Sequence, residues 1–243
     1  MKMFFTILTL TLIGISSSRS QEECLPESGV DSWLNTQCLY SRPLVIGASV
    51  SDGYKAGGVS TPMMVARHFN PQAVISNHAQ SGETGNKVIA QIPEGKYSVV
   101  LGLDLFFWDN AKGLCDKSFE ISVKNFFKRF QDQNIPMIIG TLPTELKLTG
   151  VRRILRSSSC MTKITKLLHD QCLPEKYCEL YDPNKCLISL EKHFDSLPVK
   201  KREKERLKYF ADELHPTRLG HEFCARKFIT EKRFKDLPCP LKD

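Results

Sequence analysis

Two stretches near opposite ends of the sequence hold the residue types that a serine nucleophile needs. Ser49 follows the apolar residues 44–46 and a glycine, Gly47. Asp212 precedes His215 by three positions. A neutral imidazole can take up the proton of a serine hydroxyl, while a carboxylate fixes the tautomer of that imidazole and stabilises its charged form. The three residue types predict a Ser-His-Asp triad, provided that folding brings the two stretches together.

Each stretch also has an ordinary structural interpretation. A Gly-x-Ser sequence after a strand is common in turns, so Ser49 alone is more typical of an ordinary turn serine. Asp212 and His215 alone would fit a surface turn. Ser51, two positions beyond Ser49, is an alternative nucleophile. Only the combination of the two stretches favours catalysis.

Short apolar segments alternate with helical patterns and decide where these residues lie. Strands are predicted at residues 44–46, 73–76, 97–101 and 136–140, with a short fifth strand at 180–181. Helices are predicted at residues 61–69, over the aromatic stripe at 119–130, at 145–172 and at 216–234. This alternation is typical of a parallel sheet with helices on both faces. We therefore expect an α/β fold, a flavodoxin-like three-layer α/β/α sandwich with a five-stranded parallel sheet.

Other segments are less decisive. The aromatic stripe at 119–130 is expected to be core, whereas Phe106, Phe107 and Trp108 fit either an acyl pocket or core. Residues 157–210 are expected to be the least regular part of the chain, held by their cysteines. The mixed charges of residues 200–206 indicate a solvated helix face.

Several blocks of the sequence together resemble the SGNH (GDSL-type) hydrolases. Gly47-Ala48-Ser49-Val50-Ser51-Asp52-Gly53-Tyr54 is similar to the first block of that family, and Asp212-x-x-His215-Pro216 is similar to the last. The segment Asn77-His78-Ala79-Gln80-Ser81-Gly82-Glu83-Thr84 resembles the second block. The resemblance implies the SGNH hydrolase fold, Ser49, His215 and Asp212 as catalytic residues, and an oxyanion hole that includes the N–H groups of Ser49 and Gly82.

The third block departs from this family pattern. The family has Gly-x-Asn-Asp, whose asparagine donates to the oxyanion, but here Asp104 stands at that position. An ionised carboxylate 4 Å from the oxyanion would cost about 4 kcal/mol at an effective dielectric constant near 20. Three alternatives stay open: a protonated Asp104 that donates, the amide of Asn110, or a hole with only the two backbone donors. Ala48, in place of the family's aspartate, is a second departure.

The resemblance implies a serine ester hydrolase that acts on esters of lipids, acylated sugars or small alcohols and needs neither cofactor nor metal. Two alternatives remain. One is a catalytically weak or inactive protein of the same fold with a binding or structural role. The other is an acyltransferase with the same triad.

The first residues indicate export. Lys2 is followed by an apolar run at residues 4–15 and by small polar residues, which is typical of a cleaved signal peptide. We expect a signal peptide at residues 1–20, one domain at 21–243 and a secreted or periplasmic location. Without Lys2 and Arg19 the formal charge falls from +7 to +5, a mild excess that does not favour nucleic-acid binding. No stable membrane insertion is expected, and the oligomeric state stays open.

Nine cysteines in an exported chain predict disulfide bonds. The odd number leaves at least one thiol free or bonded to another chain, and spacing does not give the pairing. One disulfide is expected to hold the segment at residues 21–42. A zinc site at Cys172, Cys178 and Cys186 is the alternative for that cluster.

Overall fold

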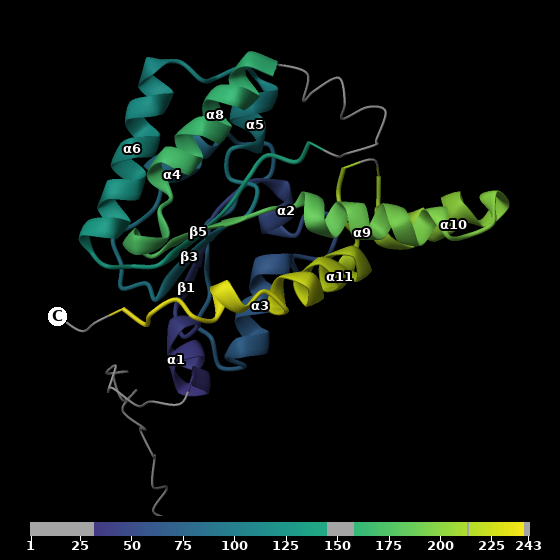
Figure 1. Ribbon diagram of the computed structural model, residues 1–243, viewed down its shortest axis with the longest axis horizontal. Coiled ribbons are helices and arrows are strands. Elements are labelled where there is room, and N and C mark those ends of the chain that lie inside the picture. Colours follow the sequence, from purple (N-terminus) through teal and green to yellow (C-terminus); the bar gives the residue numbers. More distant parts are fainter. Residues whose placement is uncertain (1–31, 145–157, 213, 241–243) are drawn as a thin grey trace, which may run out of the picture.

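Five parallel strands form the centre of the protein (Figure 1). The structure, a computed structural model, describes residues 32–144, 158–212 and 214–240. The strands are β1 Pro43–Val45, β2 Ser76–Asn77, β3 Val99–Gly102, β4 Met137–Gly140 and β5 Cys178–Tyr181. Their order, β2-β1-β3-β4-β5, is that of flavodoxin-like sheets. The predicted α/β fold with a five-stranded parallel sheet is confirmed.

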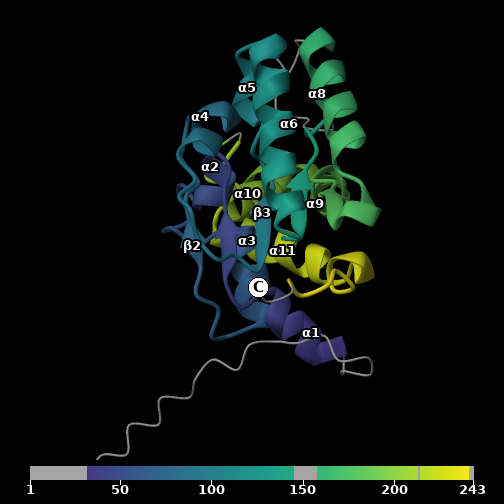
Figure 2. The ribbon, with the colours of Figure 1, turned by 90° about the vertical axis from the view of Figure 1, so that its left-hand side faces the viewer.

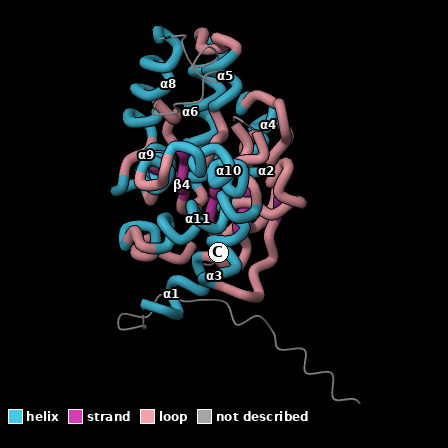
Figure 3. Tube along the Cα trace, turned by 90° about the vertical axis from the view of Figure 1, so that its right-hand side faces the viewer, coloured by secondary structure: helices cyan, strands magenta, loops and turns pink. Residues whose placement is uncertain are grey.

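Helices cover both faces of the sheet, which explains why the inner strands are apolar throughout. One layer holds α4 Gly85–Ala90, α5 Phe107–Ala111, α6 Lys117–Asp132 and α8 Ser158–Gln171, and the other holds α1 Ser32–Leu39, α3 Thr61–Phe69 and α11 Arg218–Ile229 (Figures 1 and 2). All residues of β1, β3 and β4 are buried, as expected of strands covered on both sides. Figure 3 shows the strands enclosed by these helices.

The aromatic stripe of α6 is part of the core, as predicted. Its buried residues share one hydrophobic cluster with side chains of β1, β3 and β4; they are Phe119, Val123, Phe126, Phe127 and Phe130. Asp116 begins the helix, since its side chain accepts a hydrogen bond from the Phe119 N–H. The helix predicted at 61–69 coincides with α3.

Several predicted boundaries differ from the structure, most of them by one or two residues. The second strand comprises Ser76–Asn77 and not residues 73–76, because this edge segment pairs with β1 only there, and Val74 is 57% exposed. The last helix begins at Arg218, because Pro216 pairs with Phe210 and Thr217 caps the helix. Of the helix predicted at 145–172, residues 145–157 lie outside the described residues.

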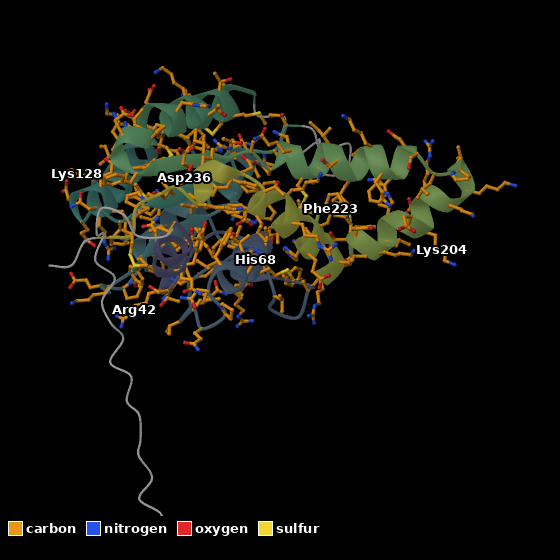
Figure 4. All side chains as sticks on the ribbon, turned by 60° about the horizontal axis from the view of Figure 1, so that its bottom comes forward. Arg42, His68, Lys128, Lys204, Phe223 and Asp236 are labelled. Carbon is orange, nitrogen blue, oxygen red and sulfur yellow. A yellow bond between two sulfur atoms is a disulfide. The ribbon has the colours of Figure 1, made fainter. Side chains whose placement is uncertain are left out.

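The prediction that residues 157–210 are the least regular part of the chain is wrong, whereas the prediction that cysteines hold this segment is confirmed by three disulfides. Beyond α8 and β5, this segment forms α9 Asn184–Asp195 and α10 Val199–Tyr209, a hairpin that projects from the rest of the protein, with Lys204 near its far end (Figures 1 and 4). Helix α9 buries Cys186, Leu190 and Phe194, which are four residues apart, whereas α10 has no buried residue. Helix α10 is held to α9 partly by ion pairs such as Arg206–Glu191 and not by a buried apolar stripe. Its sequence therefore lacks the apolar periodicity from which a helix is predicted.

Four disulfides join all eight described cysteines. The pairs are Cys38–Cys239, Cys115–Cys160, Cys172–Cys178 and Cys186–Cys224. The first confirms a disulfide clamp on the amino-terminal segment. The zinc alternative is wrong, because the three cysteines proposed for it are in disulfides. The ninth, Cys24, lies outside the described residues, as does the predicted signal peptide.

Among the helices of the described residues, none combines the length and the hydropathy that a membrane span requires.

Candidate active site

Ser49 lies just beyond the carboxyl end of β1, at the first position of the short helix α2 Ser49–Asp52. The turn before it requires a glycine. Gly47 has a φ of +145°, and a Cβ there would collide with the side chains of Asp104 and Ser51. Ser49 therefore lies beyond the sheet edge, although the residue as a whole is only 4% exposed.

Asp212 and His215 lie on a tight loop between α10 and α11. Phe210 and Pro216 pair in an antiparallel bridge that closes the loop. Within it, Asp212 Oδ1 accepts hydrogen bonds from the N–H groups of Leu214 at 2.8 Å and His215 at 2.7 Å. The aspartate thus shapes the backbone that carries the histidine, which is the turn chemistry expected of this residue type.

The fold brings the two stretches together although they are 166 positions apart. His215 Nε2 lies 3.0 Å from Ser49 Oγ, and His215 Nδ1 lies 2.8 Å from Asp212 Oδ2. Because an ionised carboxylate only accepts, Nδ1 carries the ring proton and Nε2 is free to accept from the serine hydroxyl. This is the geometry of a nucleophile, a base and the group that orients the base.

Two further residues lie beside Asp212 and His215: Tyr54, the last residue of the first block, and Lys55, which the sequence did not mark. Lys55 Nζ lies 2.6 Å from Asp212 Oδ2, and the Tyr54 ring meets the His215 ring edge-on at 4.8 Å. Partial burial raises the pKa of Asp212, but hydrogen bonds from Lys55, from the His215 ring and from two backbone N–H groups outweigh it. The net pKa of Asp212 is therefore well below its ordinary value, and the carboxylate stays ionised. Lys55 directly follows the first block, and no spacing rule marks it.

Asp104 lies beneath the turn that carries Ser49. Its Oδ1 accepts from the Ala48 N–H at 3.0 Å, its Oδ2 accepts from the Val50 N–H at 2.8 Å, and the Ser51 N–H lies 3.3 Å from both oxygens. Desolvation is the largest influence on the pKa of the Asp104 carboxyl and leaves it raised, because these hydrogen bonds offset only part of the rise. Both oxygens act as acceptors, which argues against the donor role considered from the sequence.

The loop at residues 78–84 lies against the same turn. The Gln80 N–H donates to Gly47 O at 2.9 Å, and Ser81 Oγ donates to Asp52 Oδ2 at 2.6 Å. Gly82 has a φ of +80°, a conformation that favours glycine. Within the part of the chain that the structure describes, no group accepts a hydrogen bond from the N–H of Ser49 or of Gly82.

Asn110 lies in α5 and is fully buried. Neither amide atom has a hydrogen-bond partner among the described residues, and no hydrogen bond links it to Ser49 or Gly82. Its neighbour Asp109 instead accepts from the Gly85 N–H at 2.6 Å and so caps α4. The position of Asn110 therefore gives no support to a role as oxyanion donor.

The structure also gives the positions of the alternative nucleophile, of the aromatic residues near the site and of two other histidines. Ser51 is fully buried, so a substrate does not reach its hydroxyl as the structure stands. Phe106 belongs to the main core cluster, whereas Phe107 packs with Trp108 and with Leu214 of the His215 loop. His221 is buried near the start of α11 and hydrogen-bonds Thr61 through its Nδ1. The exposed His68 lies on the surface (Figure 4).

Comparison with known proteins gives a fold and no close relative. No family model and no curated protein matches the chain. Solved structures do match. The esterase EstA from Pseudoalteromonas sp. is 15% identical with a TM-score of 0.50, over 77% of this chain and 94% of that chain. A catalytic mutant of Axe2, an acetylxylan esterase from Geobacillus stearothermophilus, is 16% identical with a TM-score of 0.54, over 79% and 93%.

A third match carries the family name. A member of the lipolytic protein G-D-S-L family from Veillonella parvula is 13% identical with a TM-score of 0.53, over 76% of this chain and 94% of that chain. The structural neighbours are SGNH/GDSL-type esterases, and this chain shares their fold. At these identities the likeness concerns the fold, so the activity has to be argued from the residues of this chain.

Proposed function

We propose that this protein is an exported serine ester hydrolase in which Ser49 is the nucleophile, His215 the general base and Asp212 the residue that orients the base. The observation that supports the proposal most is the unbroken chain of hydrogen-bond distances, 3.0 Å from Ser49 Oγ to His215 Nε2 and 2.8 Å from His215 Nδ1 to Asp212 Oδ2. Such a chain is what activation of a serine hydroxyl at neutral pH requires.

In the proposed mechanism, Ser49 Oγ attacks the ester carbonyl carbon while His215 Nε2 takes the hydroxyl proton. The tetrahedral intermediate collapses when His215 returns that proton to the leaving alkoxide, which departs as an alcohol. A water molecule, deprotonated by His215, then attacks the acyl-enzyme; the bond between Ser49 Oγ and the acyl carbon breaks, His215 returns the proton to Ser49 Oγ, and the acid leaves. No other reactant is needed.

The oxyanion is proposed to lie against the backbone N–H groups of Ser49 and Gly82. Both groups lack an acceptor among the described residues, and the loops that carry them are hydrogen-bonded to each other. Of the three alternatives left open by the sequence, this one uses only the two backbone donors. A hole that lacks a third donor costs on the order of 10²- to 10³-fold in rate, so we expect a slow enzyme rather than an inactive one.

The substrate is proposed to be a carboxylic ester with a small acyl group. Axe2 acts on acetylated xylan according to its name, and acylated sugars are one of the substrate classes that the sequence resemblance implies. Acetyl esters of saccharides are therefore the first natural substrates to try. Export is supported by the predicted signal peptide and by the four disulfides, which form in oxidising compartments.

Reaction with a fluorophosphonate probe tests the proposal, because the probe reports an activated serine without requiring the right ester. We expect the wild type to be labelled and to hydrolyse p-nitrophenyl acetate, and Ser49→Ala to do neither. Ser51→Ala is the matched control and should still be labelled. A correctly folded wild type that neither reacts with the probe nor cleaves short esters would reject the esterase and leave a binding role for the fold.

A further inference from the structure

Lys55 makes a long-range ion pair, as Lys185 and Arg233 do in the described part of the chain, but its carboxylate partner belongs to the candidate active site. Most of the surface pairs are local, such as Lys166–Asp170 and Lys124–Glu120, four residues apart on one helix. Lys55 instead meets Asp212 across 157 positions, with 2.6 Å between Nζ and Oδ2. Its carboxylate partner is also the partner of the His215 ring.

We propose that Lys55 is a positioning residue of the active site, whose ammonium group holds the Asp212 carboxylate against the His215 ring and ties the Ser49 loop to the loop of Asp212 and His215. The inference rests on the proposed function, since it assigns a role in the same triad.

The chain geometry supports this role. Lys55 lies shortly after α2, the helix that begins at Ser49, and the Tyr54 N–H donates back to Ser49 O at 3.0 Å. The ion pair is therefore a direct side-chain link between the segment that carries the nucleophile and the segment that carries the base. Lys55 also has a φ of +61°, which is uncommon for a residue with a side chain. Such a conformation persists where the surroundings impose it, often at functional sites.

The charged groups around His215 determine how the removal of Lys55 should affect the protonation of the imidazole ring. The Asp212 carboxylate binds both the His215 ring and the Lys55 ammonium group, and the Tyr54 ring meets the His215 ring edge-on. The buried His221 is also near: a positive charge on His215 lowers the pKa of His221. Lys55 compensates part of the negative charge that Asp212 presents to the imidazole. Without Lys55 the full carboxylate charge would favour the protonated ring, which cannot act as a base.

As an ion pair on the surface, Lys55–Asp212 would be expected to contribute little to stability, because both side chains are partly exposed, at 40% and 33%. Its effect should appear in the pH range of activity instead. That distinction separates a positioning residue from a merely structural one.

The test compares Lys55→Met, which removes the charge and keeps most of the stem, with Lys55→Arg, which keeps the charge. The matched control is Lys166→Met, because Lys166 also pairs with an aspartate at 2.6 Å but lies on α8. For each protein, kcat and KM for p-nitrophenyl acetate are measured from pH 5 to pH 9. The His215 ring is titrated by proton NMR, its signal being identified by its absence in His215→Gln.

In Lys55→Met we expect the acidic limb of the pH–rate profile and the midpoint of the ring titration to move upward together by about half to one pH unit, the size expected of one partly exposed charge near the ring. We expect kcat at pH 8 to fall by about three- to tenfold, on the scale of a small misplacement of catalytic groups, with KM changed less than twofold. Lys55→Arg should restore both, and Lys166→Met should match the wild type.

A Lys55→Met protein that folds and whose ring titration superimposes on that of the wild type overturns the inference. Because the titration needs no substrate, it separates this result from a failure of the proposed function. A wild type that ignores the fluorophosphonate probe but shows the shift in Lys55→Met would reject the esterase and keep the Lys55–Asp212–His215 network. Should Lys55→Met be unfolded by circular dichroism, Lys55→Gln replaces it in the same comparison.

Discussion

At the scale of single residues, the two departures from the family pattern lie side by side. Ala48 lacks the carboxylate that the family has beside its nucleophile, and Asp104 supplies a carboxylate that accepts a hydrogen bond from the Ala48 N–H. The backbone N–H groups of Ala48, Val50 and Ser51, on both sides of Ser49, are thus bound by one side chain from the neighbouring strand end. The sequence identifies Asp104 as unusual, but whether it donates or accepts depends on which way the backbone N–H groups point, and no residue pattern predicts that.

Replacement of Asp104 by asparagine distinguishes the acceptor from the donor. If Asp104 were a protonated donor, an amide would donate as well and Asp104→Asn would keep its activity. If Asp104 accepts through both oxygens, the amide NH₂ must face an N–H donor, at a cost of about 1–3 kcal/mol for an unpaired group. We expect the second result, with a loss of stability of that size and a fall in kcat/KM of at least tenfold.

Urea denaturation and steady-state kinetics check this expectation. Asp132→Asn serves as the control, because Asp132 is an exposed carboxylate on α6 that pairs only with Lys128 within the described residues. Full activity and stability in Asp104→Asn would restore the donor hypothesis.

At the scale of helices and strands, apolar patterns are informative where an element is buried and uninformative where it is not. The fully buried strands β3 and β4 and the aromatic helix α6 are predicted within a few residues, because each presents a continuous apolar run or stripe. The two-residue strand β2 and the charged helix α10 bury little, so their sequences hold no such signal. Contacts between elements are harder still to predict, and the contact between α11 and α3 is an example.

That contact makes the stability depend on pH. His221 of α11 accepts at Nδ1 from the Thr61 N–H at the start of α3, 3.2 Å away, and the ring is fully buried. Burial, and to a smaller extent His215, lower the pKa of His221 from 6.5 to about 4. The unfolded chain therefore binds a proton at a higher pH than the native protein does. This contribution to stability is complete above pH 6.5 and is lost as the pH falls toward 4, with about 2 kcal/mol lost between pH 7 and pH 5.

Urea unfolding of the wild type and of His221→Asn at pH 7 and pH 5 measures this contribution. Asparagine keeps an acceptor for the Thr61 N–H and does not titrate, so the variant should lose about 2 kcal/mol less than the wild type over this interval. All other titrating groups are common to the two proteins and cancel in the comparison. Equal losses in both would mean that His221 is not held neutral by its site.

At the scale of the whole molecule, the proposed active site depends on bringing the two halves of the chain together. Ser49 and His215 are 166 positions apart. Ser49 follows the inner strand β1, and His215 precedes α11, which packs on α3, the next helix after α2. This packing brings the two residues together. The order of blocks along the sequence predicts this encounter through the family resemblance. The disulfide pairing is not predictable in the same way, because spacing along the chain does not indicate which cysteines the fold places next to one another.

The pairing found in the structure predicts a ranking of stabilities. Cys38–Cys239 closes a separation of 201 positions, whereas Cys172–Cys178 closes one of 6. In the chain-entropy model the longer loop constrains the unfolded state more, so Cys38→Ser with Cys239→Ser should cost about 3–5 kcal/mol and Cys172→Ser with Cys178→Ser about 2 kcal/mol. The pairs suit comparison because all four cysteines are buried, so similar side chains are lost from the interior. Urea unfolding at pH 7 gives both values.

The variant without Cys38–Cys239 should keep its activity, because these cysteines make no contact with the proposed triad in the described structure. Below its unfolding transition it should hydrolyse p-nitrophenyl acetate at the wild-type rate. A loss of rate in the folded protein, or the opposite ranking of stabilities, would contradict this account of how the two cysteines hold the chain.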